Sequence, residues 1–170
     1  MTLATAIVVH QSPASAATTL GPFRIVGEDS GKCMDNPNSA SGNGVGQIIY
    51  TCNRNFPINQ QWYFDETDSG YYWIRNRASN KCLAVSGAAV TINVAIVQYT
   101  CNNGNNQEWL PKFWGTNPDG RDYYYLVSRG GVTRDQFSIH VKNGSNSNSA
   151  ALIQYYQVGG SNSRWTWYKP

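Results

Sequence analysis

The chain has 170 residues, of which 14% are charged and 13% are aromatic, and its formal net charge is +3. This length suits one domain with a substantial core. Lys and Arg are dispersed singly, so the basic stripe that nucleic acid binding requires is missing, and no apolar run approaches the ~20 residues of a membrane span. Short Tyr, Trp, Ile and Val segments separated by Gly and Asn favour many short strands over long helices.

The segment 1–16 is typical of an export signal. Residues 3–9 form an apolar core, and Ala14-Ser15-Ala16 has the small-x-small pattern that a signal peptidase recognises. No basic residue precedes the apolar run, and a disordered N-terminal tail is the alternative interpretation. We expect a signal peptide that ends at Ala16, a single domain over 17–170, and a secreted, extracellular protein.

Four cysteines agree with export. Cys33 and Cys52 have the same separation as Cys82 and Cys101, and neither pair has the C-x-x-C spacing of zinc or redox sites. An even number of cysteines in an exported chain favours disulfides. We expect Cys33–Cys52 and Cys82–Cys101, which close two equal loops, and each would stabilise the fold by roughly 3 kcal/mol.

A pattern of two strand segments followed by a Trp occurs three times. The units cover about 21–66, 71–113 and 122–170. Their strand segments and Trp residues are 23–36, 46–52 and Trp62; 72–85, 95–101 and Trp109; and 124–141, 151–157 and Trp165. In the third unit, Ser138 and Gln157 stand at the two cysteine positions with the same separation. This unit has therefore lost its disulfide but kept its length.

The repeat predicts the fold class. A fixed period of roughly 20–50 residues indicates stacked or ring-closed units. Each unit has room for about four short strands, and three such units close into a ring that leaves no exposed strand edges. The predicted fold is an all-β β-trefoil with three pseudo-symmetric four-strand repeats.

At this point the sequence resembles the ricin B-type (R-type) lectins and the similar carbohydrate-binding modules of secreted bacterial glycosidases. The resemblance covers about residues 21–170. It rests on the Q-x-W positions Gln60/Trp62, Gln107/Trp109 and the degenerate Ser163/Trp165, and on Lys32 to Asp35. It implies a non-catalytic protein without a cofactor that binds glycans or polysaccharide, galactose-type sugars ahead of xylan and arabinan.

The three Trp residues are expected in the core rather than at a ligand. Indole is large and apolar with one N–H to satisfy, which suits the centre of a three-unit core. The Gln two residues earlier can bond the backbone of an irregular turn. Function is therefore sought at the rim of each repeat.

The first repeat holds the predicted sugar site. Asp35, Tyr50 and Asn59 match the family's binding aspartate, stacking aromatic and binding asparagine, and Gln60 resembles the residue that steadies the aspartate. A sugar needs an aromatic ring against its C–H face, an acceptor for paired hydroxyls and an amide. Two alternatives stay open: Asp35 as a turn former and Tyr50 as a cross-strand packing residue.

The other repeats depart from this pattern. Ala84 stands at the Asp position of the second repeat, which removes the acceptor although Tyr99, Asn106 and Gln107 persist. The third repeat has His140, with Tyr155 and Asn162, and is a possible secondary carbohydrate-binding site. We rank the sites first, third, second. Many family members carry a Gln four residues before the second Cys, whereas here Gln98 and Gln154 come one position later and should point to the other face.

Two other function classes find less support in the sequence. A glycosidase needs two carboxylates set about 5–10 Å apart, and no motif pairs the ten acidic residues. With His10 and His140 as the only histidines, no metal cluster or Ser-His-Asp triad can be assembled, so no catalysis is expected. A protein-binding trefoil, an inhibitor or toxin-associated subunit, would use the inserted stretch 128–136.

Overall fold

A computed structural model describes residues 18–68, 70–133 and 135–169, so the expected signal peptide lies outside the described residues. The described residues form twelve strands and six single-turn 3₁₀ helices, with four strands in each repeat. The first repeat contains β1 (Thr19–Gly27), β2 (Cys33–Asp35), η1 (Pro37–Ser39), β3 (Ile48–Tyr50), η2 (Ile58–Gln60) and β4 (Trp62–Glu66). The second contains β5 (Tyr72–Asn76), β6 (Cys82–Val85), η3 (Ser86–Ala88), β7 (Val94–Tyr99), η4 (Asn105–Gln107) and β8 (Glu108–Thr116). The third contains β9 (Asp122–Ser128), β10 (Phe137–Val141), η5 (Lys142–Gly144), β11 (Ala150–Tyr156), η6 (Ser161–Ser163) and β12 (Arg164–Tyr168).

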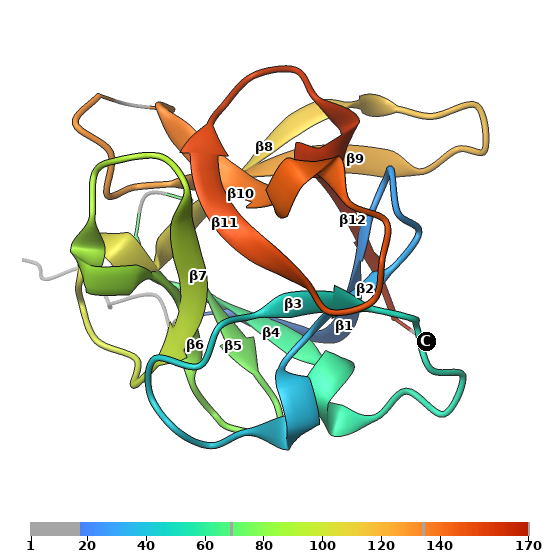
Figure 1. The fold of residues 1–170 in the computed structure, drawn as a ribbon, viewed down its shortest axis with the longest axis horizontal. Coiled ribbons are helices and arrows are strands. Elements are labelled where there is room, and N and C mark those ends of the chain that lie inside the picture. Colours follow the sequence, from blue (N-terminus) through green and yellow to red (C-terminus); the bar gives the residue numbers. More distant parts are fainter. Residues whose placement is uncertain (1–17, 69, 134, 170) are drawn as a thin grey trace, which may run out of the picture.

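Six of the strands close a barrel. The antiparallel pairs run β1–β4, β4–β5, β5–β8, β8–β9, β9–β12 and back from β12 to β1. The other six form the hairpins β2–β3, β6–β7 and β10–β11, one in each repeat. Figure 1 shows β3, β7 and β11 lying around the centre of the view, and β11 pairs with both β3 and β7. The predicted β-trefoil is confirmed, and closure pairs both edges of every barrel strand.

The core is built around three equivalent indoles. Trp62, Trp109 and Trp165 are fully buried, so the prediction that they are core residues is confirmed. Each donates its indole N–H to a backbone carbonyl of the hairpin in its own repeat: Met34 at 3.0 Å, Leu83 at 3.1 Å and Ile139 at 3.1 Å. The ring fills the barrel while its one polar group is satisfied.

Cross-links and buried amides hold the hairpins in register. The disulfides Cys33–Cys52 and Cys82–Cys101 are present as predicted. Gln98 donates to the Ala40 and Gly42 carbonyls of the first repeat. Gln154 donates in the same way to carbonyls of the second repeat. Gln98 pairs with Leu83 and Gln154 pairs with Ile139, and both partners lie in the core, so the prediction that these Gln side chains point to the other face of the hairpin is confirmed. They connect neighbouring repeats.

The indole hydrogen bond can be tested with one conservative change. Trp62→Phe removes part of the central ring volume and leaves the Met34 carbonyl without its donor, so we expect the free energy of unfolding to fall by about 2–4 kcal/mol. The control is Trp114→Phe, because Trp114 is 41% exposed. Urea unfolding of both variants gives the comparison. Equal, small losses would contradict the central role of Trp62.

Candidate functional site

The hairpin of the first repeat brings Asp35 and Tyr50 to one face. Cys33 pairs with Tyr50 and Asp35 pairs with Ile48, so the side chains of these four residues emerge on the same side of the hairpin. Met34 and Ile49, which alternate with them, lie in the core. Tyr50 is 43% exposed and Asp35 only 5%. The site therefore has an exposed ring beside a recessed carboxylate.

Two side chains hold the Asp35 carboxylate. Gln60 donates from Nε2 to Oδ2 at 2.7 Å, and Asn59 donates from Nδ2 to Oδ1 at 3.1 Å. Gln60 is itself fixed, since it also donates to the Thr51 carbonyl and accepts from the Asn53 N–H. The Asp35 carboxylate is thus bound by two side chains of η2. This favours the interpretation that Asp35 is held in place as a hydrogen-bond acceptor over the alternative that it only forms a turn. Two donors leave lone pairs of both oxygens for further hydrogen bonds.

The pKa of Asp35 reflects its buried, hydrogen-bonded position. Burial raises the pKa of the carboxyl above its usual value, while the hydrogen bonds from Gln60 and Asn59 lower the pKa and offset part of the effect.

The same amide scaffold is present in all three repeats. Asn59 Nδ2 also donates to the Asn36 carbonyl at 3.2 Å. At the equivalent places, Asn106 donates to Val85 at 3.1 Å and Asn162 donates to Val141 at 3.0 Å. These asparagines therefore connect the 3₁₀ helix to the hairpin whether or not the Asp35 position of the repeat holds an acidic residue. Sequence reasoning missed this structural role.

In the second repeat the scaffold is complete but the acceptor is absent. Gln107 donates to the Thr100 carbonyl and accepts from the Asn102 N–H, as Gln60 does with Thr51 and Asn53. Tyr99 is 46% exposed, close to the value for Tyr50. Ala84 lies where Asp35 lies, opposite Val97 on the hairpin. Hence this repeat has the ring and the amides without the carboxylate.

The third repeat contains an open cavity of about 410 Å³. Its walls include the predicted residues His140, Tyr155 and Asn162. His140 is 3% exposed, its Nε2 lies 3.1 Å from Ser138 Oγ, and its ring meets Tyr155 edge-on with the centroids 5.5 Å apart. One imidazole nitrogen is therefore already engaged within the protein, which limits what His140 can offer a ligand.

Sequence reasoning did not find the rest of this cavity. Asn143 and Gly144 of η5 line it, together with Asn93 from the second repeat and Val158. Asn143 has φ 57° and Gly144 has φ 61°, the left-handed conformation that Asn and Gly tolerate. The turn at Asn143-Gly144 could be predicted from these two residue types. The position of Asn93 in the cavity wall could not, because it depends on the pairing of β7 with β11.

The described ranges hold no group of three or more His, Cys, Asp and Glu side chains that could bind a metal ion. Within the same ranges, no helix has the length and apolarity required to cross a membrane.

Comparison with known proteins identifies the family. The model of the ricin-type β-trefoil lectin-like domain matches residues 58–155, more than half of the chain. The chain belongs to this family. A comparison with curated proteins found no match.

Solved structures agree with the family assignment. The designed three-fold symmetric protein ThreeFoil is 31% identical, with a TM-score of 0.78 over 87% of this chain and 98% of ThreeFoil. The exo-β-1,3-galactanase 1,3Gal43A from Clostridium thermocellum is 26% identical with a TM-score of 0.74, over 96% of this chain and 32% of the enzyme. The Macrolepiota procera ricin B-like lectin, solved with lactose, is 16% identical with a TM-score of 0.67, over 94% and 100% of the two chains, and shows the shared fold alone.

His140 should make this lectin-like domain less stable in acid. Burial lowers the pKa of His140 from 6.5 to about 4, although a hydrogen bond with the Tyr156 backbone opposes the shift. Between these values the unfolded chain binds a proton that the folded chain does not, so the free energy of unfolding falls as the pH is lowered. Because a shift of one pKa unit corresponds to 1.36 kcal/mol, His140 contributes up to about 3 kcal/mol to this loss in the free energy of unfolding.

The test compares urea unfolding of the parent and His140→Gln at pH 6.5 and pH 4. The parent should lose more stability than the variant over this interval. Equal losses would show that His140 is not a buried, neutral group in the folded protein. Other titrating groups, Asp35 among them, are common to both proteins and cancel in the comparison.

Proposed function

We propose that this protein is a secreted, non-catalytic lectin that binds galactose-type glycans through the hairpin site of the first repeat. The observation that carries the proposal is the Asp35 carboxylate, held by Gln60 and Asn59 on the same face as the exposed Tyr50. In this arrangement a sugar ring stacks its C–H face on Tyr50 while Asp35 accepts hydrogen bonds from two neighbouring hydroxyls. Asn59 and Gln60 keep the carboxylate in place.

The sugar class is supported by one solved structure. The galactanase that is 26% identical, 32% of which this chain covers, acts on galactan by its name. Secretion is supported by the two disulfides, since disulfides persist in oxidising compartments, and by the expected signal peptide over residues 1–16, with 17–170 as the mature domain. A single shallow site implies weak binding, with a Kd of roughly millimolar to tens of micromolar.

The cavity of the third repeat is proposed as a secondary site. His140, Tyr155 and Asn162 line it, but a neutral imidazole accepts through one nitrogen only, so it cannot clamp two hydroxyls as a carboxylate does. We therefore rank it after the first repeat. The second repeat, with Ala84, is proposed not to bind.

Substitutions in the first repeat test the main proposal. Asp35→Asn keeps the side-chain volume but removes the charged acceptor, and Tyr50→Ala removes the stacking ring. Each should weaken lactose binding by about tenfold or more, because a hydrogen bond to a charged group contributes about 1.5–3 kcal/mol. Tyr99→Ala is the matched control, since Tyr99 occupies the equivalent position with similar exposure. The measurement is titration calorimetry of all three variants with lactose. If Asp35→Asn binds lactose with the affinity of the parent, the proposal is wrong.

A gain of function is expected in the second repeat. Ala84→Asp places a carboxylate beside Gln107, whose Nε2 has a second hydrogen to donate. The new side chain lies opposite Val97, just as Asp35 lies opposite Ile48 in the first repeat. The variant should bind additional lactose, visible as a larger stoichiometry in the same titration. If Ala84→Asp folds and its stoichiometry is unchanged, the acceptor is not what the second repeat lacks.

A further inference from the structure

A tryptophan on the outer wall of the barrel is flanked by two acidic residues. Trp73 of β5 pairs with Asp65 of β4 on one side and with Glu108 of β8 on the other. Directly opposed residues in antiparallel strands project to the same face, and the neighbouring Ile74 lies in the core. Asp65, Trp73 and Glu108 therefore form a row across the outside of the barrel, where the first repeat meets the second.

Two open cavities lie along this row. One, of about 570 Å³, is lined by Asp65, Arg75, Asn80 and Thr100. The other, of about 510 Å³, is lined by Asp68, Asn103, Asn105 and Arg129 among others. Glu66 and Trp73 line both cavities, so the cavities adjoin on either side of the indole.

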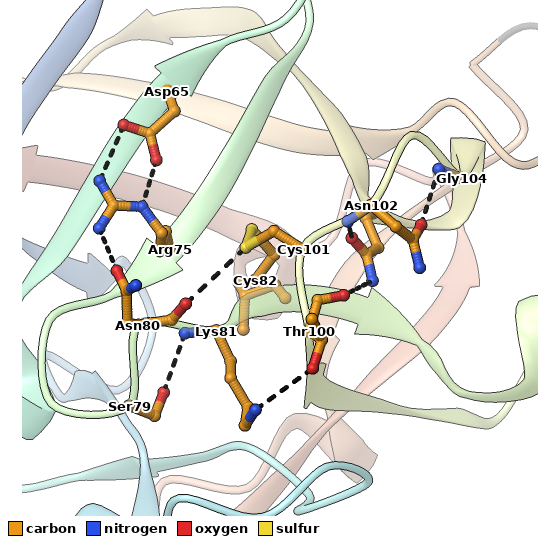
Figure 2. Close-up of a disulfide and its surroundings, with 12 residues drawn as sticks. Asp65, Arg75, Ser79, Asn80, Lys81, Cys82, Thr100, Cys101, Asn102 and Gly104 are labelled. Carbon is orange, nitrogen blue, oxygen red and sulfur yellow. Dashed lines mark hydrogen bonds and ion pairs between the residues drawn. A yellow bond between two sulfur atoms is a disulfide. The ribbon is translucent and has the colours of Figure 1, made fainter.

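Ion pairs fix the charged groups at both ends. Arg75 donates from Nε and Nη2 to the two oxygens of Asp65, at 2.5 Å and 3.0 Å, and from Nη1 to Asn80 Oδ1. Figure 2 shows these three side chains in line beside the Cys82–Cys101 disulfide. At the other end, Arg129 donates from Nη1 to both Glu108 and Asp68. Each guanidinium also lies over a tyrosine ring, so the polar groups are held in place before any ligand arrives.

This row differs from its symmetry equivalent, which lies where the second repeat meets the third. Counted from the central Trp residues, the positions of Asp65, Trp73 and Glu108 correspond to Lys112, Tyr125 and Arg164. Tyr125 is only 6% exposed, and the flanking charges are reversed in sign. An acidic row around a partly exposed Trp is therefore a feature of one barrel face, and the three-fold fold alone does not require it.

The Trp73 side chain has an unusual hydrogen-bond state. Its indole N–H is shielded from solvent and has no hydrogen-bond acceptor among the described residues. The three central indoles, by contrast, all have carbonyl partners. A buried N–H without a partner is costly, so Trp73, unlike Trp62, Trp109 and Trp165, keeps a donor that no acceptor of the described residues uses.

We propose that the two cavities on either side of Trp73 form one groove that binds a linear, uncharged oligosaccharide chain. This proposal rests on the proposed function, because it takes the ligand to be a saccharide. Trp73 offers a stacking surface for a central sugar ring, and the paired carboxylates and guanidiniums at both ends suit the hydroxyls of the adjoining rings. None of the predicted residues of the first-repeat or third-repeat site lines either cavity.

The charges of the groove restrict the ligand class. Four carboxylates, those of Asp65, Glu66, Asp68 and Glu108, face two guanidiniums, those of Arg75 and Arg129. An excess of negative charge repels chains that carry uronate or sulfate groups. A neutral chain of several sugars fits, and its affinity should rise with length as both cavities fill.

The test measures binding of neutral β-1,3-galactan oligosaccharides, from the monosaccharide to the hexasaccharide, by titration calorimetry. Trp73→Ala should weaken hexasaccharide binding about tenfold and leave monosaccharide binding unchanged. Glu66→Gln, which changes a residue that lines both cavities without removing bulk, should weaken hexasaccharide binding in the same direction. Trp114→Ala, at an exposed Trp that lines neither cavity, is the matched control and should bind as the parent does.

The two proposals fail in different ways. If Trp73→Ala and Glu66→Gln both bind the hexasaccharide like the parent, the groove is wrong, while a loss of monosaccharide binding in Asp35→Asn still supports the first-repeat site. If Asp35→Asn is unchanged and Trp73→Ala loses hexasaccharide binding, the groove stands and the first-repeat site is wrong. A parent protein that binds no member of the series overturns both.

Discussion

The trefoil depends on one hydrogen bond that is made three times at its centre. In each repeat an indole N–H from the start of a barrel strand donates to the carbonyl of the hairpin that covers the barrel. The bond sets the depth of the Trp in the core and, at the same time, the position of the hairpin over it. Because the hairpin carries the candidate sugar residues on its outer face, the core contact also fixes the geometry of the site.

A constant interior with a variable rim follows from this arrangement. The Trp, the Asn that bonds the hairpin backbone, and the hairpin register are common to all three repeats. The side chain that faces outward on the first hairpin strand is instead Asp35, Ala84 or His140 in turn. Since the scaffold does not depend on that side chain, one repeat can keep a carboxylate while another loses it, with little cost to the fold. The same freedom applies to the barrel wall, where the acidic row around Trp73 has a basic counterpart between the second and third repeats.

Sequence analysis predicted the repeated pattern and its main departures, and it missed the contacts made between repeats. Three Trp residues in register and two equal cysteine loops were sufficient for the trefoil, the disulfides and the buried indoles. The contact of Gln60 with Asp35 followed from a resemblance, and the structure contains it. The contribution of Asn93 to the third-repeat cavity and the row Asp65–Trp73–Glu108 were not predictable, because both depend on strands of different repeats lying side by side.

The most direct measurement is an amide NMR titration of the isotope-labelled domain with lactose. The account predicts that the backbone amides of Tyr50 and Asn59, and the side-chain amide of Asn59, shift with a common saturation curve, while those of Tyr99 and Asn106 stay in place. Shifts confined to other parts of the molecule, with the first-repeat hairpin unaffected at saturation, would contradict the claim that the Asp35 carboxylate, positioned by Gln60 and Asn59, forms the sugar site.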